Sequence, residues 1–500
     1  MPDRYILAID QGTTSSRAAL VDEQGTIVAM GQRELPQYYP RAGWVEHDPE
    51  EIWASCIAAI EDALQAAGAR PSDIAAIGIA NQRETVVVWE RSTGAPLARA
   101  IVWQDRRTAD LCDELRAEGA EPLVRKATGL TLDPYFSATK LAWLLREQPE
   151  LRRRAEAGEV AAGTVDSWLI WKLTGGRVHA TDYSNASRTA LFHIGRGRWH
   201  EGLCNLFGVP PAMLPHTQPS ASRFGFTDPE VLGARVAITG VAGDQQAALI
   251  GQMCLHPGQA KNTYGTGAFL LAPAGKRPPL PENGLLLSVG AAATDSAPDY
   301  VLEGSVLVAG AAIQWLRDQL GIIASADEVE ALAAAVPDTE GVTFVPAFAG
   351  LGTPHWDPHA RGLIVGITRG TTRAHLARAA LEAIAFSVAE LLDAFATALP
   401  KPIAELRADG GAARNDLLLQ LQADLAGVPV VRPVQTETTA LGAAFLAGVG
   451  NGLYTSLDEV AALWRPDRTF EPKMTAEERE EHRARWRRAV ERARGWAASG

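Results

Sequence analysis

The chain carries two short loops rich in glycine and threonine, and each belongs to an apolar run typical of a buried strand. The first, DQGTTSSR, occupies residues 10–17 after the run Ile6–Ile9, and the second lies within NTYGTGAFLL at residues 262–271. Glycine lets the backbone turn tightly and approach an anion, while threonine hydroxyls and amide groups donate to phosphate oxygens. One such loop is most often only a hairpin turn. The pair predicts a clamp that holds one nucleotide from both sides.

The two charged residues of the first loop, Asp10 and Arg17, are expected to have different roles. The carboxylate of Asp10 would repel a phosphate in direct contact, so we expect it to hold hydrated Mg²⁺, which keeps several waters and bridges to phosphates. The whole chain has 47 Lys and Arg against 59 Asp and Glu, a net charge of −12. This balance argues against a nucleic-acid or anionic-membrane surface. Positive charge for a polyanion must therefore be local, and Arg17 is the first candidate.

The length of 500 residues exceeds one ordinary core and predicts two domains. Short runs rich in β-formers, such as residues 5–9, 26–31 and 74–79, alternate with helical patterns, which indicates an α/β fold. A helix is expected after Asp48, which can cap it, with Pro49 in its first turn and Gly68 at its end. The second glycine-threonine loop begins soon after residue 250. We therefore expect domains at residues 1–250 and 251–500.

No segment reads as a membrane anchor or a secretory signal. The apolar stretch Leu381–Leu399 is interrupted by Glu382, Glu390 and Asp393, so it fits a buried amphipathic helix better than a membrane span. The four cysteines show neither a CxxC pair nor metal-ligand spacing, which indicates reduced core thiols. We expect a cytoplasmic protein without membrane insertion.

Three polar clusters stand apart from the loops: ANQRET with Arg83 and Glu84, GVAGDQQAAL with Asp244 and Gln245, and ADGGAARND at residues 408–416. Each has a plain structural explanation, as an exposed hairpin turn, a helix cap and a tight turn respectively. For each cluster considered alone, this structural explanation is better than a functional one.

Together with two phosphate loops, the clusters favour chemistry. A carboxylate at a helix head, such as Asp244, can accept a hydroxyl proton, and an Arg-Glu pair offers donors and acceptors to a small polyol. Neighbouring residues of a regular strand point to opposite faces. Arg83 and Glu84 can therefore share a ligand only if the backbone there is irregular.

The sequence lacks the common motifs of nucleotide-binding proteins. The sequence has no GxxxxGK[ST], no GxGxxG after a strand, and no HRD or DFG, which excludes a P-loop NTPase and leaves a Rossmann cofactor site and a protein kinase unsupported. The remaining candidate is the actin and hexokinase type of ATPase, a class known to contain two α/β domains, each with a phosphate loop.

The chain resembles the FGGY family of carbohydrate kinases. YFSATKLAWLLRE from Tyr135 and GLIVGITRGTTRAHLARAALE from Gly362 match the two family signatures, and DQGTTSSR, NQRET, AGDQQAAL, NTYGTGAFLL, GAAIQWLRD and DGGAARN follow in the family's order. The resemblance covers almost the whole chain. It implies two duplicated actin/hexokinase-like (ribonuclease H-like) domains with an interdomain cleft, and ATP-dependent phosphorylation of glycerol, because sugar-specific relatives usually lack NQRET.

The resemblance also implies roles for single residues. Glycerol would be held by Arg83, Glu84, Tyr135, Asp244 and Gln245, with Trp103 and Phe269 over its carbon edge and Asp244 as the general base. The ATP phosphates would meet Thr13, Thr14, Ser15 and Arg17, and Asp10 would serve Mg²⁺. Thr266, Gly267, Gly310, Gln314, Gly411 and Asn415 would hold the nucleotide. Homo-oligomers, dimers or tetramers, are expected.

One region departs from the family. Well-known bacterial members carry, shortly before AGDQQ, a basic glycine-rich loop that binds a sugar bisphosphate inhibitor, or a His that is phosphorylated. Residues 224–238 read FGFTDPEVLGARVAI and contain neither. We therefore expect neither form of control. Two alternatives to the glycerol hypothesis stay open: an FGGY kinase for another polyol or sugar, and an actin-like ATPase switch.

Overall fold

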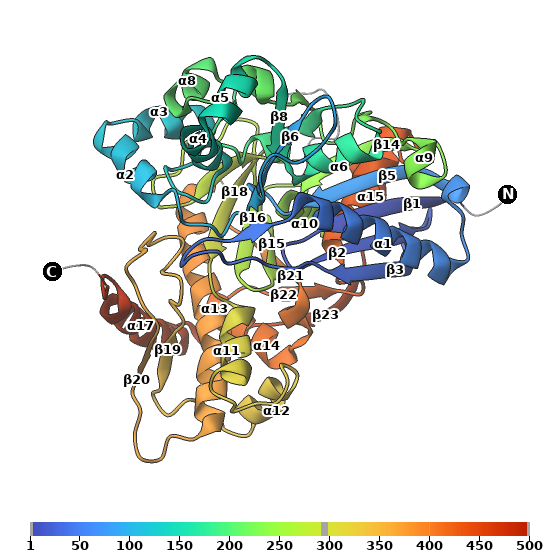
Figure 1. The fold of residues 1–500 in the computed structure, drawn as a ribbon. Helices are drawn as coiled ribbons and strands as arrows, with labels where there is room; N and C mark the ends of the chain where they lie inside the picture. The colour runs from blue at the N-terminus through green and yellow to red at the C-terminus, as the bar shows by residue number, and fades with distance from the viewer. Residues whose placement is uncertain (1–3, 292–298, 400, 498–500) are drawn as a thin grey trace. The chain divides into compact units, whose positions relative to one another are not determined.

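The computed structural model describes residues 4–291, 299–399 and 401–497 (Figure 1). The chain divides into two compact units. The first comprises Met1–Met253, Leu287–Val301 and Thr438–Trp464, and the second comprises Cys254–Leu286, Leu302–Glu437 and Arg465–Gly500. The expected division into residues 1–250 and 251–500 did not include the two returns of the chain to the first unit.

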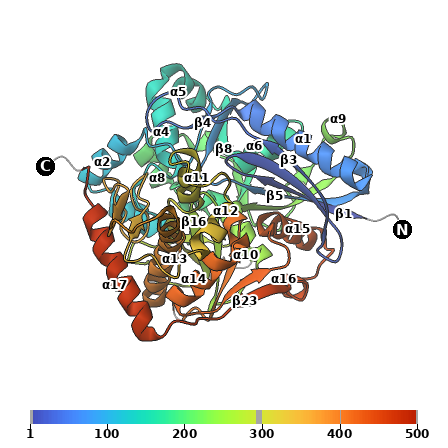
Figure 2. The ribbon, with the colours of Figure 1, turned by 90° about the horizontal axis from the view of Figure 1, so that it is seen from below.

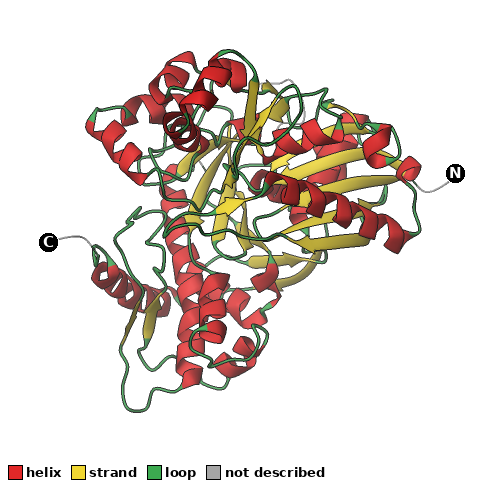
Figure 3. Ribbon diagram, in the orientation of Figure 1, coloured by secondary structure: helices red, strands yellow, loops and turns green. Residues whose placement is uncertain are grey.

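The first unit is built on a six-stranded sheet in the order β13-β14-β5-β1-β2-β3. Figure 3 draws the strands of the chain in yellow and the helices in red. The strands of this sheet are β1 (Tyr5–Gln11), β2 (Ser15–Val21), β3 (Ile27–Glu34), β5 (Ile74–Asn81), β13 (Gly225–Phe226) and β14 (Ala237–Gly243). β5 runs parallel to both β1 and β14, so the carboxyl ends of these three strands share one edge of the sheet. Ligands of open α/β sheets bind at this kind of edge.

Helix α1 (Pro49–Ala67) covers one face of this sheet. The Asp48 side chain accepts a hydrogen bond from the Glu50 amide, Pro49 lies in the first turn, and Gly68 ends the helix at a φ of 64°. The predicted capping is therefore confirmed. Ile52 and Cys56 of α1 share a core with Leu7 and Ile9 of β1.

Helix α15 (Thr438–Asn451) covers the opposite face. It contacts β1, β5 and β14, and its Gly448 lies beside Ile6, whose side chain points away from those of Leu7 and Ile9 because strand side chains alternate. Figure 2 shows α1 and α15 on either side of the sheet. The sheet of the first unit is thus completed by a helix from the distant end of the chain.

The first unit has further elements besides this sheet and the two helices that cover it. They are a four-stranded sheet in the order β4-β7-β6-β8, two strand pairs, and short helices. Their bounds are β4 (Glu46–His47), β6 (Val86–Glu90), β7 (Ala100–Ile101), β8 (Val160–Thr164), β9 (Ala180–Asp182), β10 (Phe192–His193), β11 (Arg198–Trp199), β12 (His216–Gln218), α2 (Ala109–Ala117), α3 (Glu121–Thr128), α4 (Ser137–Glu147), α5 (Pro149–Glu156), α6 (Val165–Leu173), α7 (Tyr183–Ala186), α8 (Glu201–Phe207), α9 (Pro229–Leu232), α10 (Asp244–Gly251) and α16 (Leu457–Ala461).

The second unit repeats the strand pattern of the first. β15 pairs antiparallel with β16 and parallel with β21, β21 pairs parallel with β22, and β22 pairs antiparallel with the edge strand β23. The same succession of directions runs from β2 through β1, β5 and β14 to β13. The expected duplication of an α/β domain is therefore confirmed.

The elements of the second unit are a seven-stranded sheet in the order β17-β18-β16-β15-β21-β22-β23, a two-stranded sheet and five α-helices, counted over the described part of the chain. β17 and β18 carry residues of both units. The bounds are β15 (Gln259–Tyr264), β16 (Ala268–Gly275), β17 (Leu286–Val289), β18 (Tyr300–Val306), β19 (Thr343–Val345), β20 (Leu363–Val365), β21 (Glu405–Asp409), β22 (Val430–Pro433), β23 (Pro466–Phe470), α11 (Gly310–Asp318), α12 (Glu328–Ala334), α13 (Arg373–Ala398), α14 (Asp416–Ala426) and α17 (Ala476–Ala493).

The apolar stretch at residues 381–399 forms the second part of α13 and its C-cap, Leu399, and α13 buries residues on several of its faces. Within the described ranges, no helix combines the length and apolarity that crossing a membrane requires. All four cysteines are buried free thiols, and burial raises their pKa values, as the sequence indicated.

Candidate active site

The first glycine-threonine loop is a tight turn between β1 and β2. The Gly12 amide donates to the Ser15 carbonyl at 2.9 Å. Trp103 Nε1 donates to Thr13 Oγ1 at 2.8 Å, and the Leu35 amide donates to the Thr14 carbonyl at 2.9 Å. These bonds fix the loop from two sides. Thr13, Thr14 and Ser15 therefore lie together on one rigid turn, as predicted.

Asp10 and Arg17 stand in register across β1 and β2, with 3.7 Å between Oδ2 and Nη1. Asp10 is buried, whereas about a third of the Arg17 side chain is exposed. Among the described residues, no group of three His, Cys, Asp or Glu could hold a metal ion. A single carboxylate nevertheless fits Mg²⁺, which keeps several waters and takes its other ligands from substrate phosphates.

Gln82 joins the NQRET segment to the glycine-threonine loop. Its Nε2 donates to Gln11 Oε1 at 3.0 Å and to the Gly12 carbonyl at 3.2 Å, while Thr85 Oγ1 donates to its Oε1 at 2.9 Å. The side chains of Gln11, Gln82 and Thr85 are all buried. The carboxyl ends of β1 and β5 are thus locked into one structure.

The backbone at Arg83 and Glu84 is irregular, as the shared-ligand hypothesis demanded. Glu84 has a φ of 63°, and the Thr85 amide donates to the Arg83 carbonyl at 2.7 Å. A positive φ is unusual for a residue other than glycine and is found where the surroundings enforce it, often at functional sites. Both side chains turn into the same interior and are only 2% exposed.

Arg83 is the centre of the polar cluster. Its Nε lies 3.1 Å from Asp244 Oδ1 and 3.9 Å from Glu84 Oε1, and its Nη1 donates to Gln246 Oε1 at 3.3 Å. The Asp244 side chain is 27% exposed, so this carboxylate is both held by a guanidinium and open to a ligand. Arg83 and Gln246 stand 163 residues apart in the sequence. The tertiary fold has therefore brought two of the predicted polar clusters together.

Asp244 is the first residue of α10, at the carboxyl end of β14. The Gln245 amide donates to Asp244 Oδ1 at 2.7 Å, and the helix cap is Gly243. A Cβ at Gly243 would lie 2.6 Å from Arg83 Cδ, so glycine is required for the close approach of the guanidinium arm. Asp244 is therefore placed by the strand end and is not itself the cap.

The carboxyl end of β14 is held by α7, a helix that a buried acid caps. Ser184 Oγ accepts a hydrogen bond from the Gly243 amide at 2.9 Å, and Ser184 lies in α7, which Asp182 caps. A second buried acid, Asp166, accepts hydrogen bonds from the hydroxyls of Thr164 and Thr181 at 2.5 and 2.6 Å. Burial, together with the Asp182 charge, raises the pKa of Asp166 to about 7.

Arg188 is a residue of the cluster that the sequence analysis missed. Its Nε donates to Glu84 Oε1 at 2.6 Å, its Nη1 donates to Ser288 Oγ at 2.9 Å, and the side chain has no exposed surface. Its guanidinium lies 5.4 Å from the ring centroid of Tyr135. Arg188 therefore fixes the Glu84 carboxylate and packs against a second predicted ligand-binding residue.

Lys140 was missed as well. Its ammonium donates to the carbonyls of Pro134, Tyr135 and Phe136 at 2.6, 2.5 and 3.2 Å. Burial lowers its pKa to about 8, although the carboxylates of Glu84 and two aspartates oppose this shift. The lysine cross-links the turn that presents Tyr135. The ring of Tyr135 in turn meets the ring of Trp103 edge-on at 5.7 Å between centroids.

In the second unit, the other glycine-threonine loop joins β15 to β16. The Gly265 amide donates to the Gly267 carbonyl at 2.9 Å, and the amides of Ala309 and Ala311 donate to the Thr266 carbonyl at 2.8 and 3.1 Å. The loop is thus tied to the start of α11. A Cβ at Gly310 would lie 2.6 Å from the Gly265 carbonyl oxygen, so this junction also requires glycine.

Four further predicted residues lie in the second unit. Gln314 is exposed on α11, and Phe269 is partly buried on β16 opposite Thr263. Gly411 begins a 3₁₀ turn, and Asn415 Oδ1 caps α14 by accepting from the Leu418 amide at 2.8 Å. β15 and β21 are parallel, so the loops that follow them, with Thr266 and Gly411, lie at one edge of the sheet.

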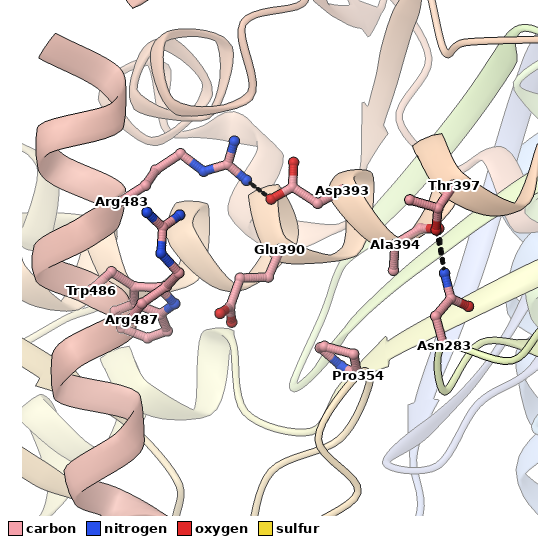
Figure 4. Close-up of a pocket in the computed structure, with 9 residues that line it drawn as sticks. All are labelled: Asn283, Pro354, Glu390, Asp393, Ala394, Thr397, Arg483, Trp486 and Arg487. Carbon is pink, nitrogen blue, oxygen red and sulfur yellow. Dashed lines mark hydrogen bonds and ion pairs between the residues drawn. The ribbon is translucent and has the colours of Figure 1, made fainter. Parts of the chain in front are cut away.

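A separate pocket of about 290 Å³ lies between α13 and α17 in the second unit (Figure 4). Its charged residues are engaged: Arg483 pairs with Asp393, Arg487 pairs with Glu480, and Glu390 lies 3.6 Å from His355 Nε2. None of the predicted site residues lines it. It offers no counterpart to the cluster around Arg83.

Residues 224–238 form the edge strand β13, helix α9 and their connections. Arg235 stacks its guanidinium 3.7 Å from the ring centroid of Phe226, and Asp228 pairs with Arg177 at 2.7 Å. The one basic residue of this segment is therefore packed on an aromatic ring, and one of its acids is paired with an arginine from outside the segment. This arrangement fits the expectation that the segment does not capture a bisphosphate.

Known proteins match this chain along most of its length. The model of the FGGY family of carbohydrate kinases matches residues 5–251 with its N-terminal domain and residues 260–450 with its C-terminal domain. A glycerol kinase of Bordetella parapertussis is 57% identical over 498 residues, 99% of this chain and 98% of its own length. A glycerol kinase of Thermus brockianus is 58% identical over 497 residues, 99% of this chain and 100% of its own length.

Solved structures agree with the match to the FGGY family. A glycerol kinase of Plasmodium falciparum with ADP superposes with a TM-score of 0.89 at 36% identity, covering 98% of each chain. A xylulose kinase of Lactobacillus acidophilus has the same fold, with a TM-score of 0.87 at 23% identity over 99% of each chain. The expected two-domain fold is confirmed, and the chain belongs to the FGGY family of carbohydrate kinases.

Proposed function

We propose that this protein transfers the γ-phosphoryl group of ATP to a terminal hydroxyl of glycerol, giving sn-glycerol 3-phosphate and ADP. The observation that carries the proposal is the buried cluster in which Arg83, Glu84 and Asp244 converge at the carboxyl ends of β5 and β14. Relatives named glycerol kinase, 56 to 58% identical over nearly the whole chain, support the same substrate. The matched structure with ADP supports an adenine nucleotide as the donor.

An uncharged triol must be recognised by hydrogen bonds of fixed direction. In our proposal Arg83 donates to glycerol hydroxyls, Glu84 accepts from them, and Tyr135 and Gln245 complete the set. Buried, preorganised charges make such bonds stronger than they would be in water. Trp103 covers the carbon edge in this proposal, and Phe269 is assigned the same role.

Asp244 is the proposed general base. The hydroxyl proton passes to its carboxylate as the glycerol oxygen forms a bond to the γ-phosphorus and the bond to the β–γ bridging oxygen breaks, so that ADP leaves. Arg83 holds this carboxylate through Nε at 3.1 Å, which orients it while part of its surface stays open. Reactions of this class are catalysed mainly by positioning and charge stabilisation.

The nucleotide roles are proposals supported by loop geometry. Thr13, Thr14, Ser15 and Arg17 would meet the phosphates on one side. Thr266, Gly267, Gly310, Gln314, Gly411 and Asn415 would hold the nucleotide in the second unit. Asp10 would hold Mg²⁺, which when bound neutralises charge on the phosphates. Homo-oligomerisation, a cytoplasmic location and the domain limits 1–250 and 251–500 stay predictions.

A substrate panel with coupled ADP detection tests the proposal. ATP turnover should depend on glycerol and should be far slower with xylulose, gluconate, other polyols or buffer alone. Turnover that is equally fast without a polyol would support an ATPase switch instead. A higher kcat/KM for another polyol or sugar would reassign the substrate within the family.

A further inference from the structure

A second polar pocket, of about 280 Å³, lies in the first unit where the β10–β11 hairpin meets the start of α8. It is lined by His193, Arg196, Arg198, Trp199, His200, Glu201 and Gly202, none of which belongs to the proposed active site. Four of these seven residues can carry positive charge and one is acidic. Such a surplus is unusual in a protein with a net charge of −12.

Hydrogen bonds set the tautomer of the two histidines. Their rings stack, with 5.5 Å between centroids and 20° between planes. The Gly195 amide donates to His193 Nδ1 and the Leu203 amide donates to His200 Nδ1, each at 3.2 Å. A ring nitrogen that accepts a hydrogen bond carries no proton, so the neutral ring carries its proton on Nε2. Both rings therefore offer an Nε2–H donor.

The two arginines add positive charge to the pocket. Arg196 and Arg198 are exposed, and within residues 4–291, 299–399 and 401–497 neither guanidinium has an ion pair or a side-chain hydrogen bond. Burial first, and then the charges of Arg196, His200 and Arg198, lower the pKa of His193. The positive charges of the pocket thus add to burial in lowering the pKa of this histidine.

The hairpin and the start of α8 hold the histidine side of the pocket in place. Phe192 is fully buried, and the ring of Trp199 meets its edge at 5.7 Å between centroids. Trp199 Nε1 also donates to the Pro215 carbonyl at 2.8 Å. A Cβ at Gly202 would lie 2.9 Å from His200 Cε1, so glycine makes room for the ring. The histidine donors are therefore preorganised, which lowers the cost of binding a ligand.

We propose that this pocket is a binding site for a small phosphate-bearing anion. A phosphate presents three or four acceptor oxygens in a tetrahedral arrangement, and two Nε2–H donors and two guanidinium groups can satisfy them together. A carboxylate has only two oxygens and would leave donors unused. A cation is disfavoured by the arginines. The volume leaves room for a small organic group attached to the phosphate.

Histidine NMR tests the proposal on the intact protein, with inorganic phosphate as the probe. The ring Hε1 signals of His193 and His200 are assigned with His193→Gln and His200→Gln and followed during titration at constant pH and ionic strength. We expect both signals to shift saturably with phosphate and not with chloride. The Arg196→Ala/Arg198→Ala double variant should weaken phosphate binding at these two rings by about tenfold or more.

Arg488→Ala, which removes an exposed charge from α17 in the other unit, is the matched control and should leave the titration unchanged. Circular dichroism and glycerol-dependent turnover verify that each variant is folded. Phosphate shifts that match those of chloride, that do not saturate, or that persist unchanged in the double arginine variant would overturn the proposal. The readout is local, so phosphate binding elsewhere does not imitate it.

Discussion

Replacing Arg188 by methionine tests whether an arginine outside the expected ligand set controls glycerol recognition through Glu84. Arg188 is fully buried and donates to Glu84 Oε1 at 2.6 Å, while Arg83 Nε is 3.9 Å from the same oxygen. Without Arg188, Glu84 loses the hydrogen bond at 2.6 Å that orients its carboxylate. Methionine fills similar space without charge, so the variant removes the charge and the hydrogen bonds to Glu84 and Ser288 while leaving no large cavity.

The magnitude follows from the type of bond that is lost. A hydrogen bond to a charged group is worth about 1.5 to 3 kcal/mol, so the half-saturation concentration for glycerol should rise by roughly 10- to 150-fold. Breaking a buried ion pair also costs about 3 to 5 kcal/mol of stability. Because Arg83 and Lys140 stay near Glu84, we expect the lower end of that stability range.

The assay is a double-mutant cycle of Arg188→Met and Glu84→Gln, read as glycerol dependence at saturating ATP and as ATP dependence at saturating glycerol. If Arg188 acts through Glu84, adding Arg188→Met to Glu84→Gln should change glycerol affinity little further. The ATP dependence should move much less than the glycerol dependence. Fully additive effects, or an unchanged glycerol half-saturation in folded Arg188→Met, would refute the reasoning.

Three further predictions concern catalysis, pH and control. Asp244→Asn should lower kcat by about 10²- to 10⁴-fold without loss of nucleotide binding, since an amide cannot accept the proton; near-normal turnover would reduce Asp244 to a structural role. The pKa of Asp166 is about 7 in the folded state, against 3.8 for the free side chain. The unfolded state therefore releases this proton at lower pH than the folded state, so the free energy of unfolding is highest below about pH 4 and falls as the pH rises to 7. Asp166→Asn should therefore flatten the fall in unfolding free energy between these values, and an identical pH profile in denaturant titrations would contradict this. Fructose 1,6-bisphosphate at millimolar concentration should not inhibit through residues 224–238, and an inhibition abolished by Arg235→Ala would show the opposite.

Local signals in the sequence were sufficient for some features. The caps of α1 at Asp48 and Gly68 were predictable because a helix end is set by residues adjacent in sequence. The irregular backbone at Glu84 was stated from the sequence as the condition under which Arg83 and Glu84 could share one ligand, and the structure meets this condition.

Features that depend on long-range contacts were not predictable. Arg188 stands 104 residues from Glu84, and no spacing rule connects them. Lys140 lies in a helical pattern where a lysine usually faces water, yet it is buried on three carbonyls. α15 is apolar on most sides, which predicts burial but does not say which sheet it covers. Its return to the first unit is a property of the tertiary fold.

The central claim, that the cluster around Arg83 is the glycerol site of a kinase, is tested most directly by the glycerol dependence of ADP formation in Arg83→Ala at saturating ATP. Arg83 is buried and contacts Asp244, Glu84 and Gln246, so its loss removes a charged donor from the centre of the proposed pocket. We predict a half-saturation concentration for glycerol raised by roughly 10- to 150-fold, with ATP dependence much less affected. A folded variant with the unchanged glycerol half-saturation of the native protein would contradict the account.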